Sequence, residues 1–227
     1  MLLTQLQRKS LLLFSTLILA ALPGVASPLA ITNASFETLP VGGLPYACAA
    51  DCSYSAGAIP GWTMVGSGGQ FQPGNPGNTN YFDTLSDGLT SAYSGGGVIS
   101  QIVGAPVVFG EVYTLLVDIG YRKDAAFAGS ADLLINGQIY TATGVATQGA
   151  FTTFTATYTG LLADVGQSIT IELKSNGSQG NFDNVRLDGT APDSGVPEPA
   201  AFLLAGPALL GLAAWKRRRT FAAGRAS

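Results

Sequence analysis

The sequence predicts an all-β protein, specifically an antiparallel β-sandwich that is most consistent with a jelly roll. Short runs of β-branched and aromatic residues recur between glycine, proline and asparagine residues, which typically separate strands. Some of these runs alternate strictly. In 168–174, Ile169, Ile171 and Leu173 share one face, as expected for a half-buried strand. No stretch in the middle of the chain has the period of an amphipathic helix.

The middle of the chain has room for one core and eight clear strands. About 170 residues lie between the two end segments, enough for a single domain. Asn136-Gly137 predicts a hairpin between 131–135 and 138–141, because a type I′ turn needs a positive φ at both central positions. The expected strands are 30–36, 61–65, 97–103, 112–121, 131–135, 151–158, 168–174 and 182–187.

Composition and charge exclude several function classes. The 227 residues are 47% hydrophobic and 11% charged, and none is histidine. Ser-His-Asp and Cys-His catalysis and histidine-containing metal sites are therefore excluded. Seven of the 11 lysines and arginines lie near the two ends; 27–195 holds the other four beside 13 acidic residues, a formal charge of −9. Such an acidic domain argues against nucleic acid as a partner.

The N-terminus predicts a secretory signal peptide over 1–26. Arg8 and Lys9 precede the apolar run 11–22, and small residues follow up to Ala26, after which we expect cleavage. The alternatives are a buried helix and a membrane anchor. Twelve apolar residues are too few to cross a hydrocarbon core of about 30 Å.

The C-terminus predicts a linker over 191–199, a single transmembrane helix with a basic cluster over 200–219, and a cytoplasmic tail over 220–227. Residues 200–215 are uncharged, and the cations after them favour the cytoplasmic side. The residues of the motif and of the cluster are Val196, Pro197, Glu198, Pro199, Lys216, Arg217, Arg218 and Arg219.

The order of a Pro-Glu-Pro motif, an apolar run and a basic cluster resembles the PEP-CTERM sorting signal of Gram-negative bacteria. The resemblance implies recognition of Pro197-Glu198-Pro199 by an exosortase, a membrane protease, after export with the help of signal peptidase. It implies that the protein is anchored transiently in the inner membrane and is then delivered to the cell surface or extracellular matrix. An ordinary tail anchor is the alternative.

The middle of the chain resembles galactose-binding-like jelly rolls, which include many carbohydrate-binding modules. The resemblance rests on ITNASFE at 31–37, IPGW at 59–62, VYTLLVDIGY at 112–121 and NFDNVRL at 181–187. It implies a β-sandwich domain over 27–190.

The same resemblance implies a structural Ca²⁺ held by Glu37 and Asp183, since the terminal strands are neighbours in that fold. Carboxylate oxygens suit calcium. Alternatively, Asp183 and Asn184 cap or turn the last strand, and Glu37 is solvated.

Cys48 and Cys52 are the only thiols, and export favours a disulfide between them that closes a small loop. Two thiols without histidine do not supply the usual four zinc ligands.

Polar and aromatic residues in 67–83 are the candidate sugar ligands, because sugars present apolar faces and a ring of hydroxyls. Arg122 is a further candidate, for an acidic polysaccharide; the alternative is that it pairs with an internal aspartate. Trp62 either stacks on a sugar or belongs to the core, and the loop itself is equally consistent with no ligand. The loop candidates are Gln70, Phe71, Gln72, Asn80, Tyr81 and Asp83.

These observations together predict an exported, non-catalytic module that associates with exopolysaccharide. No pair of carboxylates is marked out as a catalytic pair, so we do not expect an enzyme. A structural matrix or adhesin-like protein without a small-ligand site is the alternative, and a polysaccharide-processing enzyme is a third reading.

Overall fold

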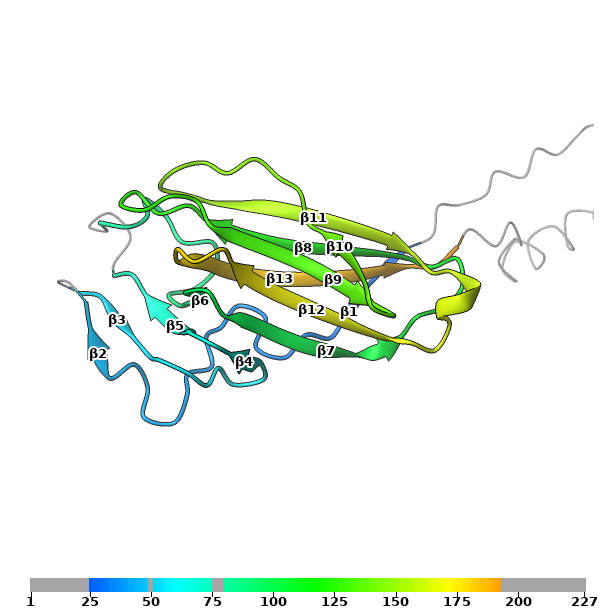
Figure 1. Cartoon of the computed structure of the whole chain (residues 1–227), viewed down its shortest axis with the longest axis horizontal. Coiled ribbons are helices and arrows are strands. Elements are labelled where there is room, and N and C mark those ends of the chain that lie inside the picture. Colours follow the sequence, from blue (N-terminus) through cyan, green and yellow to red (C-terminus); the bar gives the residue numbers. More distant parts are fainter. Residues whose placement is uncertain (1–24, 49–50, 75–79, 193–227) are drawn as a thin grey trace, which may run out of the picture. The chain divides into compact units, whose positions relative to one another are not determined.

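The computed structural model describes residues 25–192, apart from 49–50 and 75–79, and these residues form two antiparallel β-sheets (Figure 1). Residues 24–192 are one compact unit that holds every described strand and the whole described core. This unit therefore contains what it needs to fold by itself. The predicted signal peptide, except its last two residues, and the predicted sorting signal lie outside the described residues.

The larger sheet has eight strands, and its long central strands are β8 and β13. In spatial order they are β11 (Phe151–Thr159), β8 (Val112–Gly120), β13 (Gly180–Thr190), β6 (Ser91–Ser94), β5 (Gly68–Gln72), β3 (Ser53–Tyr54) and β2 (Tyr46–Ala47), while β1 (Ala26–Leu29) pairs with β13.

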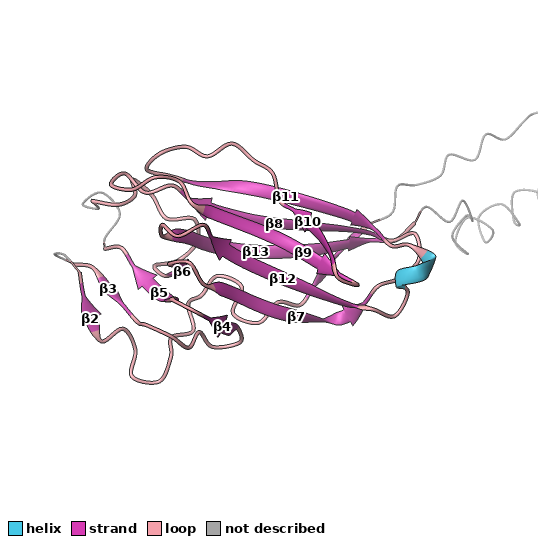
Figure 2. Ribbon diagram, viewed as in Figure 1, coloured by secondary structure: helices cyan, strands magenta, loops and turns pink. Residues whose placement is uncertain are grey.

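The smaller sheet has five strands, and the described residues contain one short 3-10 helix, η1 (Leu162–Asp164), drawn cyan in Figure 2. Among residues 25–192, outside the two gaps, no helix has the length and apolarity needed to cross a membrane. In spatial order the strands are β10 (Gln138–Thr141), β9 (Gly129–Ile135), β12 (Ser168–Ser175), β7 (Val98–Pro106) and β4 (Thr63–Val65).

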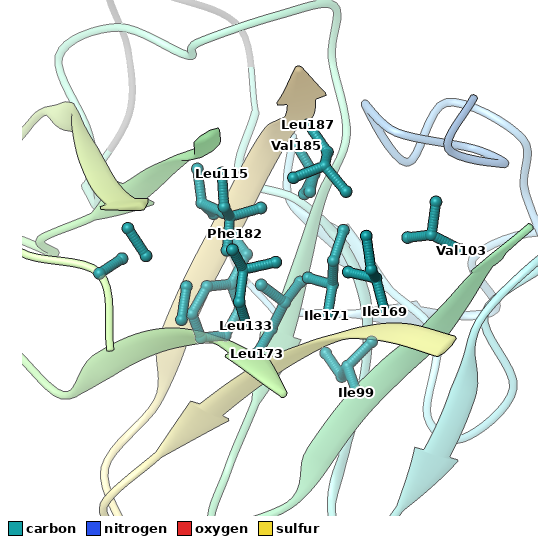
Figure 3. Packing of buried hydrophobic residues seen from close by; sticks show 14 of the residues in the cluster. Ile99, Val103, Leu115, Leu133, Ile169, Ile171, Leu173, Phe182, Val185 and Leu187 are labelled. Atoms are coloured by element: carbon teal, nitrogen blue, oxygen red, sulfur yellow. The ribbon is translucent and has the colours of Figure 1, made fainter. Parts of the chain in front are cut away.

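The core lies between the two sheets, where alternate residues of each strand point inward (Figure 3). Leu115 and Phe182 come from the larger sheet, and Leu133, Ile171 and Leu173 from the smaller one; all are 0% exposed. The prediction of an all-β antiparallel sandwich is thus confirmed. The predicted hairpin is present as well: Asn136 and Gly137 have φ of 48° and 77° between β9 and β10.

Two expected elements are wrong. Residues 30–36 form turns instead of a strand, because Asn33 and Phe36 have φ of 52° and 57°, which a strand does not allow. Part of the expected loop 67–83 is a strand instead: Gly68–Gln72 form β5, paired with both β3 and β6.

Candidate functional site

The two central strands of the larger sheet, β8 and β13, carry three buried polar side chains on their outer face, which points away from the core. Phe182 of β13 and Ile119 of β8 point into the core. Their neighbours Asn181, Asp183 and Asp118 therefore point to the opposite face. All three are at most 7% exposed, so something must cover this face.

The cover is residues 81–90, which we call the strap. Phe82 of the strap is 0% exposed, and its ring lies 4.6 Å from that of Phe151 on β11. Both rings occupy the space above Gly120, where a Cβ would come within 2.9 Å of each. The strap thus packs directly on the outer face.

Three carboxylates fasten the strap by accepting hydrogen bonds from it. The Asp87 N–H donates to Oδ2 of Asp183 at 2.9 Å, and the Ser86 hydroxyl donates to Asp118. Oε1 of Glu37 accepts from two further strap amides, those of Leu89 at 2.9 Å and Thr90 at 2.7 Å.

Asp183 is the carboxyl group whose ionisation is most perturbed. It is 1% exposed, and burial raises its pKa to about 8. The nearby charges of Asp87 and Glu37 also raise the pKa, while N–H donors from Asp87 and Asn184 lower it without offsetting the burial. At neutral pH Asp183 therefore holds a proton, which it can donate.

Asp118, one strand away, is surrounded by donors. Besides Ser86, its oxygens accept hydrogen bonds from the Thr153 hydroxyl at 2.6 Å, the Asn184 amide at 2.9 Å and the Arg186 guanidinium at 3.1 Å. These bonds satisfy the oxygens of Asp118 and tie the strap, β11 and β13 to β8.

Asn181 differs from both carboxylates because it has no partner. It is 0% exposed, and neither Nδ2 nor Oδ1 makes a hydrogen bond with any described residue. It lies between Gly120 of β8 and Tyr93 of β6 in the sheet register. A buried amide of this kind costs free energy unless a ligand or a water satisfies it.

Aromatic side chains lie next to these buried polar residues, toward the edge of the larger sheet. Tyr93 lies 6.3 Å from Tyr54 and 6.5 Å from Phe71, in edge-to-face arrangements. The Phe71 ring is 5.4 Å from Tyr81, and the Arg122 guanidinium stands over Tyr81 at 4.4 Å. The outer face therefore combines a proton donor, an unsatisfied amide and aromatic surface.

The predicted ligand residues are divided between this site and other places. Phe71, Tyr81 and Arg122 are brought together there, and Arg122 also pairs with Asp124 at 2.7 Å. Gln70 is 0% exposed, and its amide donates to the Phe36 carbonyl.

The remaining candidates lie at the margins of the strap. The Gln72 amide donates to the Thr90 hydroxyl at 2.9 Å, Asp83 pairs with Lys123, and Asn80 is exposed.

Trp62 belongs to the core: it is 7% exposed and its ring lies 5.3 Å from that of Phe36. Cys48 and Cys52 are joined by a disulfide next to β2 and β3, with their Cα atoms 5.3 Å apart.

The predicted calcium ligands Glu37 and Asp183 both fasten the strap and interact electrostatically. Within the described part of the chain, no group of three or more Cys, Asp or Glu residues is arranged to hold a metal ion. Calcium at this position stays a prediction, and no step below uses it.

A cavity of about 370 Å³ lies elsewhere, at the ends of β9 and β12. Its one charged lining residue is Lys174, whose ammonium is already paired with Asp132 at 2.5 Å and Glu172 at 3.4 Å. This cavity therefore offers a ligand no free charge.

Sequence reasoning missed Asn181, Asp118 and the strap. Asp118 did leave a signal, since it is the one charge inside the apolar run VYTLLVDIG. Asn181 left none, because a polar residue at a strand start is ordinary. The strap was missed because the residues that it contacts, Asp118 and Asp183, lie about 30 to 100 residues away in the sequence.

The chain has recognisable relatives. The model of the HpiC1-like family, described as HpiC1 cyclase, matches residues 27–188. The Stig cyclase Fisc from Fischerella sp. TAU, solved in complex with (3Z)-3-(1-methyl-2-pyrrolidinylidene)-3H-indole, is 22% identical with a TM-score of 0.60, and the alignment covers 74% of this chain and 100% of that one.

A second solved structure is a cyclase from the same organism in complex with 4-(1H-indol-3-yl)butan-2-one. It is 21% identical with a TM-score of 0.58, and the alignment covers 74% of this chain and 100% of that chain. At such identities, the structural similarity shows the fold. No curated protein sequence matches the chain.

Proposed function

Because this chain belongs to the HpiC1-like cyclase family, we propose that the strap-covered outer face is a cyclase site in which Asp183 is the proton donor. The observation that carries the proposal is the juxtaposition, on one face, of a buried carboxyl with a pKa of about 8 and an unpartnered amide. Perturbed ionisable groups of this kind are common at active sites.

The expectation of a non-catalytic module that binds exopolysaccharide is wrong, and so is the expectation that the chain is not an enzyme. The match to a cyclase family over 27–188 overturns both. The comparisons do not support a function based on exosortase sorting. The lack of a marked carboxylate pair does not exclude catalysis, since a single buried aspartic acid can serve as the acid.

The proposed chemistry is an acid-initiated isomerisation. Asp183 donates its proton to the substrate, leaving a cationic carbon, and the electron pair of a substrate double bond then attacks that carbon to close the ring. Loss of a proton from the new ring restores the Asp183 carboxyl, so the product is an isomer of the substrate. Aromatic faces such as those of Tyr93 and Phe71 stabilise the intermediate cation.

The proposed substrate is a flat, largely apolar molecule of the indole class. Rings of this type stack on the aromatic side chains of the outer face, and the Asn181 amide supplies one donor and one acceptor for a polar group. Both similar structures described above contain an indole compound. For this chain, indole compounds are the first probes to test.

Substrate entry requires the strap to lift. Asp183 is 1% exposed, and its only strap contact among the hydrogen bonds is the amide of Asp87. Lifting the strap breaks that bond and exposes Asp183 together with Asn181. Lids that close over substrates serve many enzymes in this way.

We also infer that the sandwich is a jelly roll. From β6 to β9, successive strands alternate between the larger and the smaller sheet. This alternation is the connectivity expected when two Greek keys wrap around one core.

The test separates binding from turnover. Residues 24–192 are incubated with indoles that carry an alkenyl or iminyl side chain, and liquid chromatography with mass spectrometry detects products of unchanged mass and new retention time. Calorimetry measures binding of 4-(1H-indol-3-yl)butan-2-one, the compound seen in a similar structure.

We expect Asp183→Asn to lose turnover at least 100-fold while probe binding changes less than threefold. Asp188→Asn, which alters a carboxyl farther along β13 at the position in register with Thr114 of β8, is the matched control and keeps wild-type activity. Wild-type turnover in Asp183→Asn, or no turnover of any indole by the wild type, would contradict the proposal.

A further inference from the structure

Two loops at one end of the sandwich display large apolar side chains to solvent. One loop, 107–111, joins β7 to β8; the other, 160–167, joins β11 to β12 and contains η1. We call the exposed residues of these loops the apolar tip. They are Val108 (48% exposed), Phe109 (60%), Leu161 (54%), Leu162 (76%) and Val165 (48%).

The two loops are held rigidly side by side. Gly110 donates its N–H to the Gly160 carbonyl and Gly160 donates to the Glu111 carbonyl, both at 2.8 Å. Val107 and Gly166 add two more bonds: Val107 N–H to the Gln167 carbonyl, and Gly166 N–H to the Val107 carbonyl, each at 2.9 Å. The exposed side chains are therefore presented by a fixed backbone.

The polarity of the tip is inverted relative to an ordinary surface loop. Its aspartate, Asp164, is turned inward and 8% exposed, where the Tyr158 hydroxyl donates to it at 2.6 Å and the Asn136 amide at 2.8 Å. Leu161 and Leu162, which precede it, and Val165, which follows it, are exposed. Contiguous exposed apolar side chains usually mark an interaction surface.

The two ends of the described chain lie at this same tip. Ala26 and Val112 both pair with Thr190 in the sheet register, and a Cβ on Gly110 would lie 3.3 Å from Pro192. Beyond Pro192 the sequence runs into the 16 uncharged residues 200–215, followed by Lys216 and three arginines. Eight residues of chain span at most about 28 Å.

From these observations we infer that the apolar tip docks onto a lipid bilayer. The apolar sequence that follows Pro192 and the location of both chain ends favour lipid over a protein partner. The formal charge of −9 over 27–195 favours neutral lipid over anionic lipid. The inference does not depend on the proposed cyclase activity, since the tip lies at the far end of β8 from Asn181.

Vesicle partitioning tests this inference on residues 24–192, whose folding is first checked by a cooperative thermal melt. The wild type should sediment with phosphatidylcholine vesicles and less with vesicles that contain phosphatidylserine. The double variant Phe109→Asp, Leu162→Asp should lose at least tenfold in partitioning, because two charges would have to enter the bilayer interface.

The matched control places the same charges on apolar side chains that are equally exposed but lie on the smaller sheet. Val65 and Ile102 are 64% and 70% exposed, and Val65→Asp, Ile102→Asp should change partitioning less than twofold. Absence of wild-type partitioning, or an equal loss in the control, would overturn the inference. So would a wild-type dimer that the tip variant converts to a monomer without any effect on vesicle binding.

Discussion

The strap-covered face and the apolar tip lie at opposite ends of β8, and they break the usual distribution of polarity in opposite ways. At the strap, polar groups are hidden: Asn181 and Asp183 are at most 1% exposed on the outside of a sheet. At the tip, apolar groups are displayed: Leu162 is 76% exposed, while Asp164 is buried beside it.

Neither arrangement favours folding. An unsatisfied buried amide costs about 1–3 kcal/mol, and leaving a leucine in water forfeits about 1.5–3 kcal/mol of burial. A sequence that keeps both arrangements is explained most simply if each meets something outside the folded chain. The difference between the regions then indicates two kinds of contact, a small polar-and-aromatic ligand at one end and a lipid surface at the other.

The largest expected effect concerns the pH dependence of stability, measured by urea unfolding in chelator-containing buffers. The pKa of Asp183 is about 8 in the folded chain against an ordinary value of 3.8. Between these pH values the folded state keeps a proton that the unfolded state has released. Stability is therefore full below pH 4 and falls as pH rises from 4 through 8, by up to about 6 kcal/mol.

Asp183→Asn should remove this decrease of stability between pH 4 and 8. Asp124→Asn should not, because the Arg122 guanidinium lowers the pKa of Asp124 from its ordinary value of 3.8, so that this carboxyl is ionised throughout the range in which Asp183 titrates. A wild type whose stability is flat between pH 4 and 8 would show that Asp183 is not held in its protonated form.

The next effect comes from unfastening the strap. Asp118→Ala removes the acceptor of four hydrogen bonds, including the one from Ser86, and should lower the free energy of unfolding by about 3 kcal/mol. Asp124→Ala breaks an exposed ion pair with Arg122 and should cost less than about 1 kcal/mol. Equal losses in the two variants would mean that the strap contributes no more than a surface contact.

A smaller effect of opposite sign is expected at Asn181. Replacing its unpartnered amide with an apolar group of similar shape, Asn181→Leu, should raise stability by about 1 kcal/mol and abolish binding of the indole probe. Gln70→Leu is the control: its amide donates to the Phe36 and Thr38 carbonyls, so this variant should lose stability. Destabilisation by Asn181→Leu would indicate that the amide already has a partner.

The smallest effect on folding is expected at the tip. Leu162→Asp changes a side chain that is 76% exposed, so the free energy of unfolding should move by less than about 0.5 kcal/mol. A loss above 2 kcal/mol in a thermal melt would mean that the leucine packs within the domain, and the contrast with the strap would disappear.

Much of the sandwich could be predicted from the sequence because local patterns set it. The alternation in 168–174 and the Asn136-Gly137 turn both appear in the structure as expected. The expected strand at 30–36 failed because a left-handed turn at Asn33 is a conformational choice that alternation does not reveal. The alternation of residues predicts which face of a strand is buried. It does not predict well where the strand begins.

The site was harder to predict because it depends on contacts between distant segments. The sequence pointed to Phe71, Tyr81 and Arg122, which do meet, but for a sugar-binding loop. The resemblance to galactose-binding-like jelly rolls predicted Asp183 as a calcium ligand, which stays a prediction; nothing local in the sequence shows that the strap will bury this residue. Its ionisation follows from burial, which is a property of the fold.

One measurement tests the central claim most directly: nuclear magnetic resonance of residues 24–192 during titration with 4-(1H-indol-3-yl)butan-2-one. The account predicts that the side-chain amide of Asn181 and the strap amides of Asp87 and Leu89 shift together and saturate with one affinity, while the tip residues do not move. Shifts confined to the cavity around Lys174, or saturable binding that leaves Asn181 and the strap unchanged, would contradict it.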